Sequence, residues 1–594
     1  MLFPLETKSE VAASGSAVAI CEPIAGVPQS AASASSAGAS SEVPAIARFL
    51  PSLTDLAFLM PLIFIFLKLS GARTLLGDGD TGWHVRTGEW ILAHHQVPHI
   101  DIFSFSRPGA PWFAWEWLWD ALFAMVHQRF GLAGVVLASI IVICFTSIGL
   151  FRLIRRTCNN SLVAIAVTLL ATGGCAIHWL ARPHLFTLLF LVVTLHITNR
   201  AAEGRTKLLA WMVPLTLLWT NLHGGFFIVF LIFACYIGSD LLNAAIEPGA
   251  ERRRQFLRST KPWLATSLGC LAVTFINPYG WELHKHVIGY ITDPYQLQHI
   301  SEFQSMNFHA PVVVYFEPLM FLALLTALWD ARNRRFADVF MSLGWLHLSL
   351  IAQRNVPIFA IAAAPLVARA VVAAIDAGRN SGFAAWVGRA SSWFETSSAS
   401  FEETDRLWRV HIVSVLPVLL AAALLLAPKP MSAKFTSTYD PTFYPEAALP
   451  LLLSPETHHI FAEDEWGDYL IYHLYPTKKV FVDGRSDFYG DEFGERYLDV
   501  MNVKPGWQKT LDKYAIDTIA ISPKFALTST LKISREWRVV YDDTVTVVFR
   551  RAASDHSRLP VSLISSNEGK IRDHAITNTT NDRKITQHTT PPTT

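Results

Sequence analysis

The chain has 594 residues, of which 51% are hydrophobic and only 16% are charged, and its mean hydropathy is +0.31. Soluble globular proteins carry about 25% charged residues, so this balance indicates a membrane protein. The formal net charge of +1 gives no reason to expect nucleic acid as a partner. No cysteine follows Cys270, which excludes a disulfide framework in the C-terminal third.

Residues 1–47 are rich in Ala, Ser and Gly and have little to bury. We expect them to form a disordered N-terminus on the cytoplasmic side. No basic segment directly precedes an apolar core here. The first long apolar run is therefore expected to act as a signal anchor and not as a cleaved signal peptide.

Eleven apolar runs follow within residues 48–430, the predicted transmembrane domain. A span needs roughly 20 apolar residues, and several runs are shorter, so nine to thirteen spans fit the sequence. The eleven runs are Leu53–Leu69, Gly131–Leu150, Ser161–Leu180, Leu185–Thr198, Leu208–Thr220, Gly224–Leu242, Trp263–Ile276, Val312–Trp329, Ala337–Ile351, Val356–Ile375 and Val410–Ala427.

The charges of the loops predict the orientation, because Lys and Arg concentrate in cytoplasmic loops. The loops after the even-numbered runs are basic, whereas "NLHGG" has no Lys or Arg and residues 277–311 contain only Lys285. The N-terminus is therefore predicted to be cytoplasmic and the chain after Met431 to lie outside. The basic residues are Arg152, Arg155, Arg156, Arg200, Arg205, Lys207, Arg252, Arg253, Arg254, Arg258, Lys261, Arg332, Arg334 and Arg335.

The first outer loop, residues 71–130, opens with the polar stretch "DGDTGWHVRTGEW". Asp78, Asp80, His84 and Arg86 lie in it, and Glu116 follows among the tryptophans of "PWFAWEWLWD". An Asp-Gly-Asp often forms a turn and a helix cap, and this interpretation stays open beside a functional one. The tryptophans favour an interfacial aromatic belt over a sugar platform.

Polar residues also end several later runs on the same predicted outer face: Arg182, His184, Asn221, His223 and Arg354. Polar groups at membrane depth are costly unless they line a cavity or pair with one another. We therefore predict that they meet the first outer loop in one hydrated pocket. Helix caps and arginines that extend to the interface are the alternative interpretations.

Residues 431–551 alternate short β-rich and helical segments, which predicts a small extracytoplasmic α/β domain. We expect strands at Lys479–Val482, in "YAIDTIAIS" and in "VTVVFRR", and helices at Phe493–Val500 and in "WQKTLDKY". The segment "DGRSDFYG" is compatible with ligand contact and with a loop held by a salt bridge of Arg485. Residues 552–594 are expected to be a disordered tail.

An N-in first span, an outer loop with a D-x-D-like motif, many spans and an outer C-terminal domain resemble the GT-C superfamily. These are polyprenyl-phosphate-sugar-dependent glycosyltransferases, among them the protein O-mannosyltransferases and the aminoarabinose transferases of lipid A. The motifs D-x-D-x-x-W-H-x-x-x-G, P-x-x-D-x-F-S and W-x-x-x-E-W-L more closely resemble a group of bacterial integral membrane proteins. "WTNLHGGF", "NPYG", "RNVPIFAI" and "WGDYLIY…VFVDGRSDFYG" extend that resemblance over most of Leu53–Arg550.

The resemblance implies a mainly α fold, a polytopic bundle of about 11 spans with the small α/β domain outside, in a bacterial inner membrane. It also implies an enzyme that moves a sugar, with inversion, from a polyprenyl-phosphate carrier to a glycan, lipid or protein acceptor. By position, Asp78 and Asp80 match the family's acidic pair, which acts as the base or positions the acceptor. Arg86, Arg182 and Arg354 are the candidate phosphate-binding cations.

The remaining candidate substrate-binding residues are His84, Glu116, His184, Asn221 and His223. Two aspartates around a glycine also suit Mg²⁺ or Mn²⁺, but a lipid monophosphate donor does not require a metal, and no cofactor is predicted. Two other functions stay open, a non-catalytic envelope scaffold and a transporter or flippase of lipid-linked envelope material. A transporter predicts inverted repeats and ionisable groups near the bilayer midplane, where only Glu317 lies well inside a run.

Overall fold

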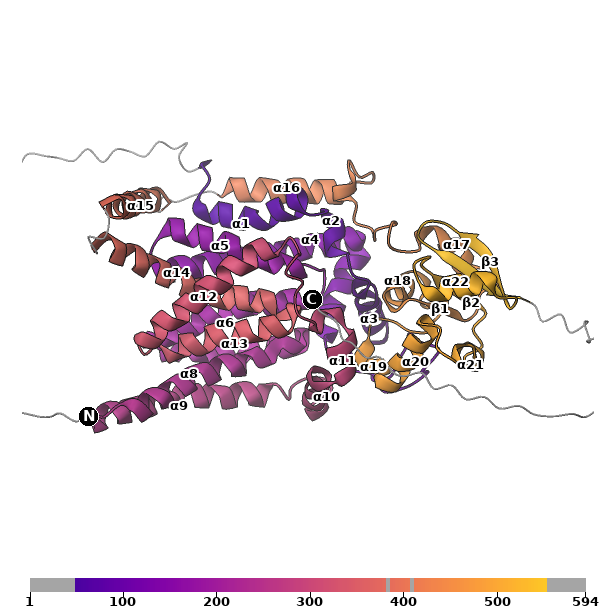
Figure 1. The fold of residues 1–594 in the computed structure, drawn as a ribbon, viewed down its shortest axis with the longest axis horizontal. Coiled ribbons are helices and arrows are strands. Elements are labelled where there is room, and N and C mark those ends of the chain that lie inside the picture. Colours follow the sequence, from indigo (N-terminus) through magenta and orange to yellow (C-terminus); the bar gives the residue numbers. More distant parts are fainter. Residues whose placement is uncertain (1–48, 381–384, 406–410, 553–594) are drawn as a thin grey trace, which may run out of the picture.

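The computed structural model describes residues 49–380, 385–405 and 411–552. The predicted disordered segments, 1–47 and 552–594, lie outside these ranges except for residue 552. The described residues form a helix bundle with a small mixed α/β unit at one end (Figure 1). The bundle and its flanking segments contain α1 (Leu53–Ile63), α2 (Ala72–Leu75), α3 (Asp80–His94), α4 (Trp117–Cys158), α5 (Ser161–Cys175), α6 (His184–Ala202), α7 (Met212–Leu222), α8 (Ile228–Ile246), α9 (Ala250–Val273), α10 (Trp281–Thr292), α11 (Pro294–His299), α12 (Val313–Arg332), α13 (Phe336–Ile351), α14 (Val356–Asn380), α15 (Ala385–Asp405) and α16 (Ile412–Leu425).

Six helices within the described ranges are long and apolar enough to cross a membrane. They are Trp117–Cys158, Ser161–His178, His184–Ala202, Gly224–Ile246, Val313–Arg332 and Gln353–Gly378. α13 and α16 are shorter apolar helices, and the other predicted runs fall on α1, α7 and α9. The chain is therefore an integral, multi-pass membrane protein, whereas the total of about 11 spans and the N-in, C-out orientation stay predictions.

The first outer loop contains more helix than its sequence indicates. α3 occupies residues 80–94, and α4 already begins at Trp117, well before the predicted span at Gly131. Gly131 interrupts α4 with φ 61° and ψ −162°, a backbone conformation that a glycine adopts without strain. The residues before Gly131 therefore form a separate helical segment that leads from the outer loop into the membrane helix.

A buried carboxylate fixes the start of the first helix. The Ser52 hydroxyl accepts a hydrogen bond from the Asp55 N–H at 3.0 Å, and the Asp55 carboxylate accepts from the Ser52 N–H at 2.8 Å. This capping box satisfies N–H groups that have no partner inside the helix. The same carboxylate accepts from the Ser414 hydroxyl at 2.6 Å, and His411 Nδ1 lies 3.0 Å from it. These contacts hold α16 against α1.

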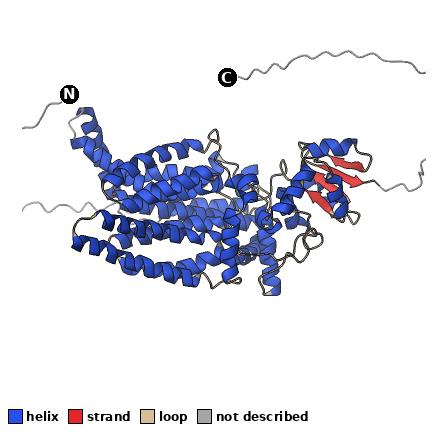
Figure 2. Cartoon of the chain, turned by 60° about the horizontal axis from the view of Figure 1, so that its bottom comes forward, coloured by secondary structure: helices blue, strands red, loops and turns tan. Residues whose placement is uncertain are grey.

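The α/β unit contains a four-stranded sheet with strand order β1-β2-β4-β3. β1 and β2 are parallel, and the other neighbouring pairs are antiparallel. Figure 2 shows the strands at the end of the molecule away from the bundle. Its elements are α17 (Leu449–Leu453), β1 (Ile460–Ala462), α18 (Asp464–Leu474), α19 (Ser486–Tyr489), α20 (Asp491–Met501), α21 (Trp507–Lys513), β2 (Thr518–Ile521), α22 (Ala526–Ile533), β3 (Trp537–Asp542) and β4 (Val547–Arg551).

Most predicted elements of this unit are present, as β2, β4, α20 and α21, but the strand predicted at Lys479–Val482 is not formed. Val480 instead makes single β-bridges to Ser104 of the outer loop and to Ile460 of β1. The segment is strand-like in composition and extended. Its pairing, however, is divided between two neighbours and does not continue along either of them. The outer loop and the C-terminal unit therefore share backbone hydrogen bonds.

Candidate functional site

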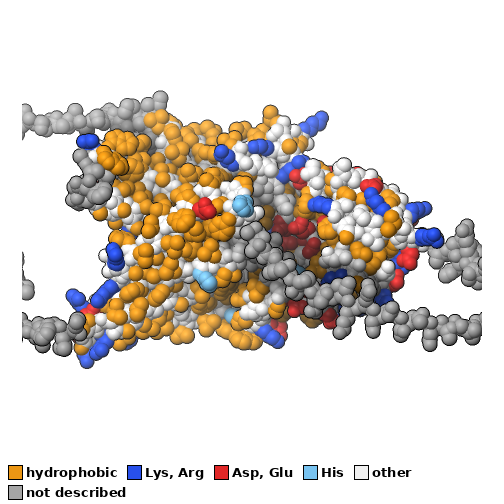
Figure 3. Space-filling view, viewed as in Figure 1, with side chains coloured by type: hydrophobic (Ala, Val, Ile, Leu, Met, Phe, Trp, Pro, Cys, Tyr) orange, Lys and Arg blue, Asp and Glu red, His pale blue; other side chains and the backbone are white. Residues whose placement is uncertain are grey.

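The start of α3 lies where the bundle meets the C-terminal unit. A Cβ on Gly79 would lie 2.7 Å from the backbone oxygen of Glu465 and 2.8 Å from the Cβ of Asp468. A Cβ on Gly82 would lie 2.8 Å from the Cβ of Tyr472. Glycines at these positions therefore allow α18 to pack directly against α3. Figure 3 shows carboxylates gathered between the apolar bundle and the C-terminal unit.

Arg182, just before α6, binds three carboxylates from two segments of the chain. Its Nη1 lies 2.7 Å from Asp78 Oδ2 and 3.3 Å from Glu302 Oε1, and its Nη2 lies 2.6 Å from Asp80 Oδ2. The Asp80 N–H donates to Asp78 Oδ1 at 2.8 Å, which orients the two aspartates together. Glu302 lies in the short turn Ser301–Phe303 and completes the cluster from a distant part of the chain.

The protonation of this cluster reflects burial opposed by Arg182. Burial raises the pKa of Asp80 to about 7, although Arg182 lowers it. Burial alone would also raise the pKa of Glu302, but His178, Arg182 and Arg354 lower it to about 2. Glu302 is therefore a fixed anion, whereas Asp80 exchanges a proton near neutral pH.

The C-terminal unit adds a fourth carboxylate, Asp468 on α18, which the sequence did not identify. Its side chain is buried, and its Oδ1 accepts the Gly484 N–H at 2.9 Å. A Cβ on Gly484 would lie 2.5 Å from Asp468 Oδ2 and 2.7 Å from Asp80 Oδ1. The two carboxylates thus flank the same glycine.

Four side chains form a second, buried chain of polar groups behind Asp80. Asp120 Oδ1 lies 2.7 Å from His84 Nδ1, and His84 Nε2 lies 3.4 Å from Glu116 Oε2. Glu116 Oε1 in turn lies 3.4 Å from His223 Nε2. The Gly225 N–H donates to His223 Nδ1 at 2.9 Å, so a neutral His223 carries its proton on Nε2, toward Glu116.

Burial keeps this chain uncharged at neutral pH. It raises the pKa of Glu116 to about 8, although Arg182 opposes the shift. Burial, with Arg182 and His223 nearby, holds the pKa of His84 well below its usual range. Burial, with Arg354 and Arg182 nearby, lowers the pKa of His223 to about 3. The sequence predicted these three residues at one site, and the structure places them in contact.

Arg354 lies near Glu302, but no carboxylate is bound to its guanidinium among the described residues. Its Nη1 donates to the Tyr290 hydroxyl at 3.2 Å, and its guanidinium lies 4.6 Å from the centre of the Phe303 ring. Among the described residues it forms no ion pair. Most of its donors are therefore available to an anion.

Three predicted substrate-binding residues have other partners. Arg86 Nε donates to the Tyr472 carbonyl at 2.8 Å, and this hydrogen bond attaches α3 to α18. Arg86 Nη1 lies 2.6 Å from Glu89 of α3 itself. Asn221 accepts from Trp117 Nε1 at 2.9 Å and donates to the Ile276 carbonyl. His184 Nε2 lies 2.7 Å from the His178 carbonyl. These contacts hold the backbone around the site.

The segment "DGRSDFYG" contains the salt bridge of Arg485 that one of its two interpretations predicted. Arg485 Nη2 lies 2.7 Å from Asp483 and 2.9 Å from Asp101 of the outer loop, and all three side chains are buried. Its guanidinium stacks 4.5 Å from the centre of the Trp112 ring. Asp101 of the outer-loop motif P-x-x-D-x-F-S and Arg485 of the C-terminal motif therefore form a buried ion pair. We call this contact the joint between the bundle and the C-terminal unit.

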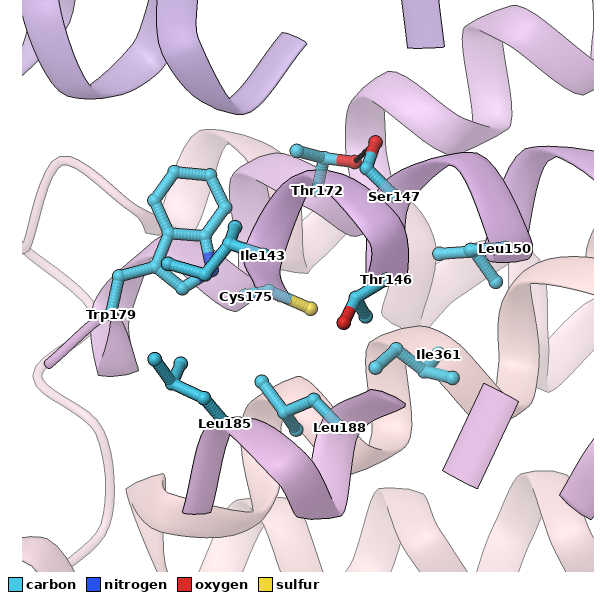
Figure 4. Close-up of a pocket in the computed structure, with 10 residues that line it drawn as sticks. All are labelled: Ile143, Thr146, Ser147, Leu150, Thr172, Cys175, Trp179, Leu185, Leu188 and Ile361. Carbon is cyan, nitrogen blue, oxygen red and sulfur yellow. Dashed lines mark hydrogen bonds between the residues drawn. The ribbon is translucent and has the colours of Figure 1, made fainter. Parts of the chain in front are cut away.

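A cavity of about 20 Å³ lies inside the bundle among α4, α5, α6 and α14 (Figure 4). Its lining is mainly apolar, with Thr146, Ser147 and Thr172 as the hydroxyl groups. This volume accommodates about one water molecule and not a sugar. Within the described residues, no group of three or more His, Cys, Asp or Glu side chains is arranged to hold a metal ion.

No family model and no curated protein matches the chain. Solved structures do: the oligosaccharyltransferase AglB from Archaeoglobus fulgidus, in complex with an inhibitory peptide and a dolichol-phosphate, matches with a TM-score of 0.49 at 12% identity, over 86% of this chain and 74% of that one. ArnT from Cupriavidus metallidurans bound to undecaprenyl phosphate matches with a TM-score of 0.40 at 15% identity, over 84% and 98%.

Proposed function

We propose that the chain is a membrane glycosyltransferase that moves a sugar from a polyprenyl-phosphate carrier to a hydroxyl of an envelope acceptor on the extracytoplasmic face. The observation that carries the proposal is the Arg182 cluster at the junction of the bundle and the C-terminal unit. There a carboxylate with a pKa near neutral, Asp80, is bound by Arg182. A second arginine, Arg354, interacts with Glu302 of the same cluster only at longer range and forms no ion pair among the described residues.

The reaction needs a base at the acceptor and a cation at the leaving group. Asp80 takes the proton of the acceptor hydroxyl. At the same time the oxygen of that hydroxyl bonds to the anomeric carbon from the face opposite the phosphate. The bond between the anomeric carbon and the phosphate oxygen breaks, and its electron pair leaves with the polyprenyl phosphate. A base works best when its pKa lies near the working pH, and the pKa of Asp80 of about 7 satisfies this condition.

Arg354 supports the leaving group, because a guanidinium binds phosphate oxygens through parallel hydrogen bonds. Arg182 is less available for this role, since three carboxylates already occupy it. The polyprenyl tail would lie in the bilayer along the apolar surface of the bundle (Figure 3). A transporter would instead place its ionisable groups near the bilayer midplane, whereas this cluster lies at the junction with the C-terminal unit.

The direct test is mass spectrometry of envelope glycans, lipids and glycoproteins from a host strain that lacks the gene. We expect the wild-type chain to restore a sugar modification that the strain has lost, and Asp80→Asn not to restore it. Asp499→Asn, at a partly exposed position of α20, is the matched control and should restore it fully. Restoration by Asp80→Asn, or no lost modification, contradicts the proposal.

Binding of the carrier is tested separately with undecaprenyl phosphate as the probe. A hydrogen bond to a charged group contributes about 1.5–3 kcal/mol, so Arg354→Gln should weaken binding by about 10-fold or more. Arg332→Gln, at the far end of α12, is the control and should leave the affinity unchanged. Equal binding by both variants in native mass spectrometry would remove Arg354 from the phosphate site.

A further inference from the structure

We propose that Asp468 of the C-terminal unit shares one proton with Asp80, and that this pair, not Asp80 alone, takes the proton of the acceptor hydroxyl. The inference rests on the proposed function for its catalytic part. It assigns the C-terminal unit a catalytic residue in addition to any role in binding an acceptor.

The geometry of Gly484 brings the two carboxylates together. The site that its missing Cβ would fill lies 2.5 Å from Asp468 Oδ2 and 2.7 Å from Asp80 Oδ1. Asp468 is only 1% exposed, and the Gly484 N–H binds its Oδ1. No donor among the described residues binds Asp468 Oδ2. Arg182 binds Asp80 through the opposite oxygen, Oδ2. Asp468 Oδ2 and Asp80 Oδ1 therefore both face Gly484, and the Trp83 side chain also contacts the Asp80 carboxyl.

The surrounding charge favours a shared proton. The charged and titratable groups that interact with the pair are Arg182, Asp78, Glu302, Asp483, Glu465, Glu116, Tyr439 and Tyr444. One arginine among so many acids cannot balance two further carboxylates, and two like charges in a buried site do not both ionise readily. Burial, with Asp80 and Asp483 nearby, raises the pKa of Asp468 well above its usual range. One proton shared by the two groups lowers both the free-energy cost of burying their charges and the repulsion between them.

The pair then behaves as one base. Before the reaction it holds one proton and one negative charge. The acceptor hydroxyl gives its proton to the free oxygen as its own oxygen bonds to the anomeric carbon, and both carboxyl groups are then neutral. The excess proton is lost to water after the glycosylated product leaves. Such a pair titrates in two steps that belong to both residues.

Infrared difference spectroscopy of the purified, ¹³C-aspartate-labelled protein tests the shared proton without any assay of transfer. Ordinary aspartates are ionised at pH 6. Asp120 of the buried polar chain also stays protonated and contributes a C=O band in every variant. We expect the wild type to show one further C=O stretch of a protonated aspartic acid at this pH, which is missing in Asp80→Asn and in Asp468→Asn and retained in Asp499→Asn. No such band in the wild type overturns the inference, and this measurement does not require either variant to fold.

The catalytic part is tested by the pH dependence of kcat/KM. Its acidic limb should lie near pH 7 in the wild type and move to lower pH in Asp468→Asn, because the neighbouring carboxylate no longer opposes ionisation of Asp80. A purely structural role would lower the rate at every pH and leave the limb in place. A stoichiometric divalent cation recovered with the wild type and lost in Asp468→Asn would also overturn the inference.

The two proposals can fail separately. An infrared band that both variants remove, in a protein without transfer activity, leaves the pair intact and rejects the proposed function. Transfer activity with no such band, or with a limb that Asp468→Asn does not move, rejects the pair and leaves the proposed function standing.

Discussion

At the scale of single residues, Arg182 determines the charge balance of the site. Burial by itself would lower its pKa, but Asp80, Asp78 and Glu302 together raise it well above the ordinary value. The guanidinium therefore stays charged at every pH at which the protein is folded. It also links the outer loop, the start of α6 and the turn at Glu302 through one side chain.

Arg182→Gln should therefore reduce both stability and turnover. Loss of the cation leaves three carboxylates without their common partner, and we expect the free energy of unfolding to fall by up to about 3 kcal/mol. Turnover should fall roughly 100-fold or more, since Asp80 loses its orientation. Arg182→Lys is the matched variant: it keeps the charge but cannot bind Asp78 and Asp80 through separate nitrogens, so it should regain stability more than turnover. Thermal unfolding and a transfer assay separate the two effects.

Glu116 makes stability depend on pH. Its folded-state pKa of about 8 lies above its ordinary value of 4.5, so its contribution to stability is complete below about pH 4.5 and is lost as the pH rises toward 8. Glu116→Gln should therefore flatten the fall in stability between pH 5 and pH 8, by up to about 1.4 kcal/mol per pH unit. Thermal unfolding in detergent at several pH values measures this. The same slope in Glu116→Gln as in the wild type would contradict it, and Glu251→Gln at the exposed start of α9 is the control.

The residues of the site were predictable to the extent that they belong to apolar runs or stand out beside them. Asp80, His84, Glu116 and Arg182 are polar groups next to spans, where each requires a partner. Asp468 gives no such signal, because it lies in a helix of a polar unit far along the chain. Its proximity to Asp80 is created only when α18 packs on α3. Arg86 shows the reverse case, since it follows Asp80 by less than two turns of α3 and yet binds α18.

At the scale of elements, the contact between α3 and α18 holds the site together. Gly79 and Gly82 allow the two helices to approach, and Arg86 connects them by hydrogen bonds to the Tyr472 carbonyl. The glycines of "DGDTG" were open to interpretation as a turn. The structure gives them a packing role, which sequence alone does not reveal because the opposing helix lies nearly 400 residues away.

Gly82→Ala tests this contact. Its Cβ would lie 2.8 Å from the Cβ of Tyr472 and 2.9 Å from the Asp468 carbonyl, so the helices must separate. Overpacking of this kind costs typically about 1–3 kcal/mol, and the displacement of Asp468 should also reduce turnover. Gly344→Ala, in α13 with no atom within 4 Å of its Cβ, is the control and should be neutral or slightly stabilising. Equal unfolding temperatures of the two variants would show that the packing of α3 against α18 does not require a glycine at position 82.

At the scale of the whole molecule, the helices follow from the length of the apolar runs, and all eleven runs fall on helices. The joint between the bundle and the C-terminal unit does not follow from any run, since Asp101 and Arg485 are distant in sequence. The turn between α8 and α9 lies at the end of the bundle away from the C-terminal unit (Figure 1). This arrangement is compatible with the predicted orientation, in which basic loops are cytoplasmic.

Cysteine labelling tests that orientation. In a chain whose native cysteines are replaced, Asp499→Cys in α20 should react with a membrane-impermeant maleimide in intact cells. Glu203→Cys, at the exposed end of α6, should react only after the membrane is permeabilised. Labelling of the two positions in the opposite order would invert the topology and place the Arg182 cluster on the cytoplasmic face.

The joint of Asp101 with Arg485 also has a consequence for biogenesis. The ribosome completes the acidic outer loop early, whereas Asp468 and Arg485 emerge hundreds of residues later. Until then Asp101 lacks its ion-pair partner, and the carboxylates around Arg182 lack Asp468 beside them. A polypeptide released before α18 has been made would therefore insert into the bilayer without the carboxylate on which the proposed transfer depends.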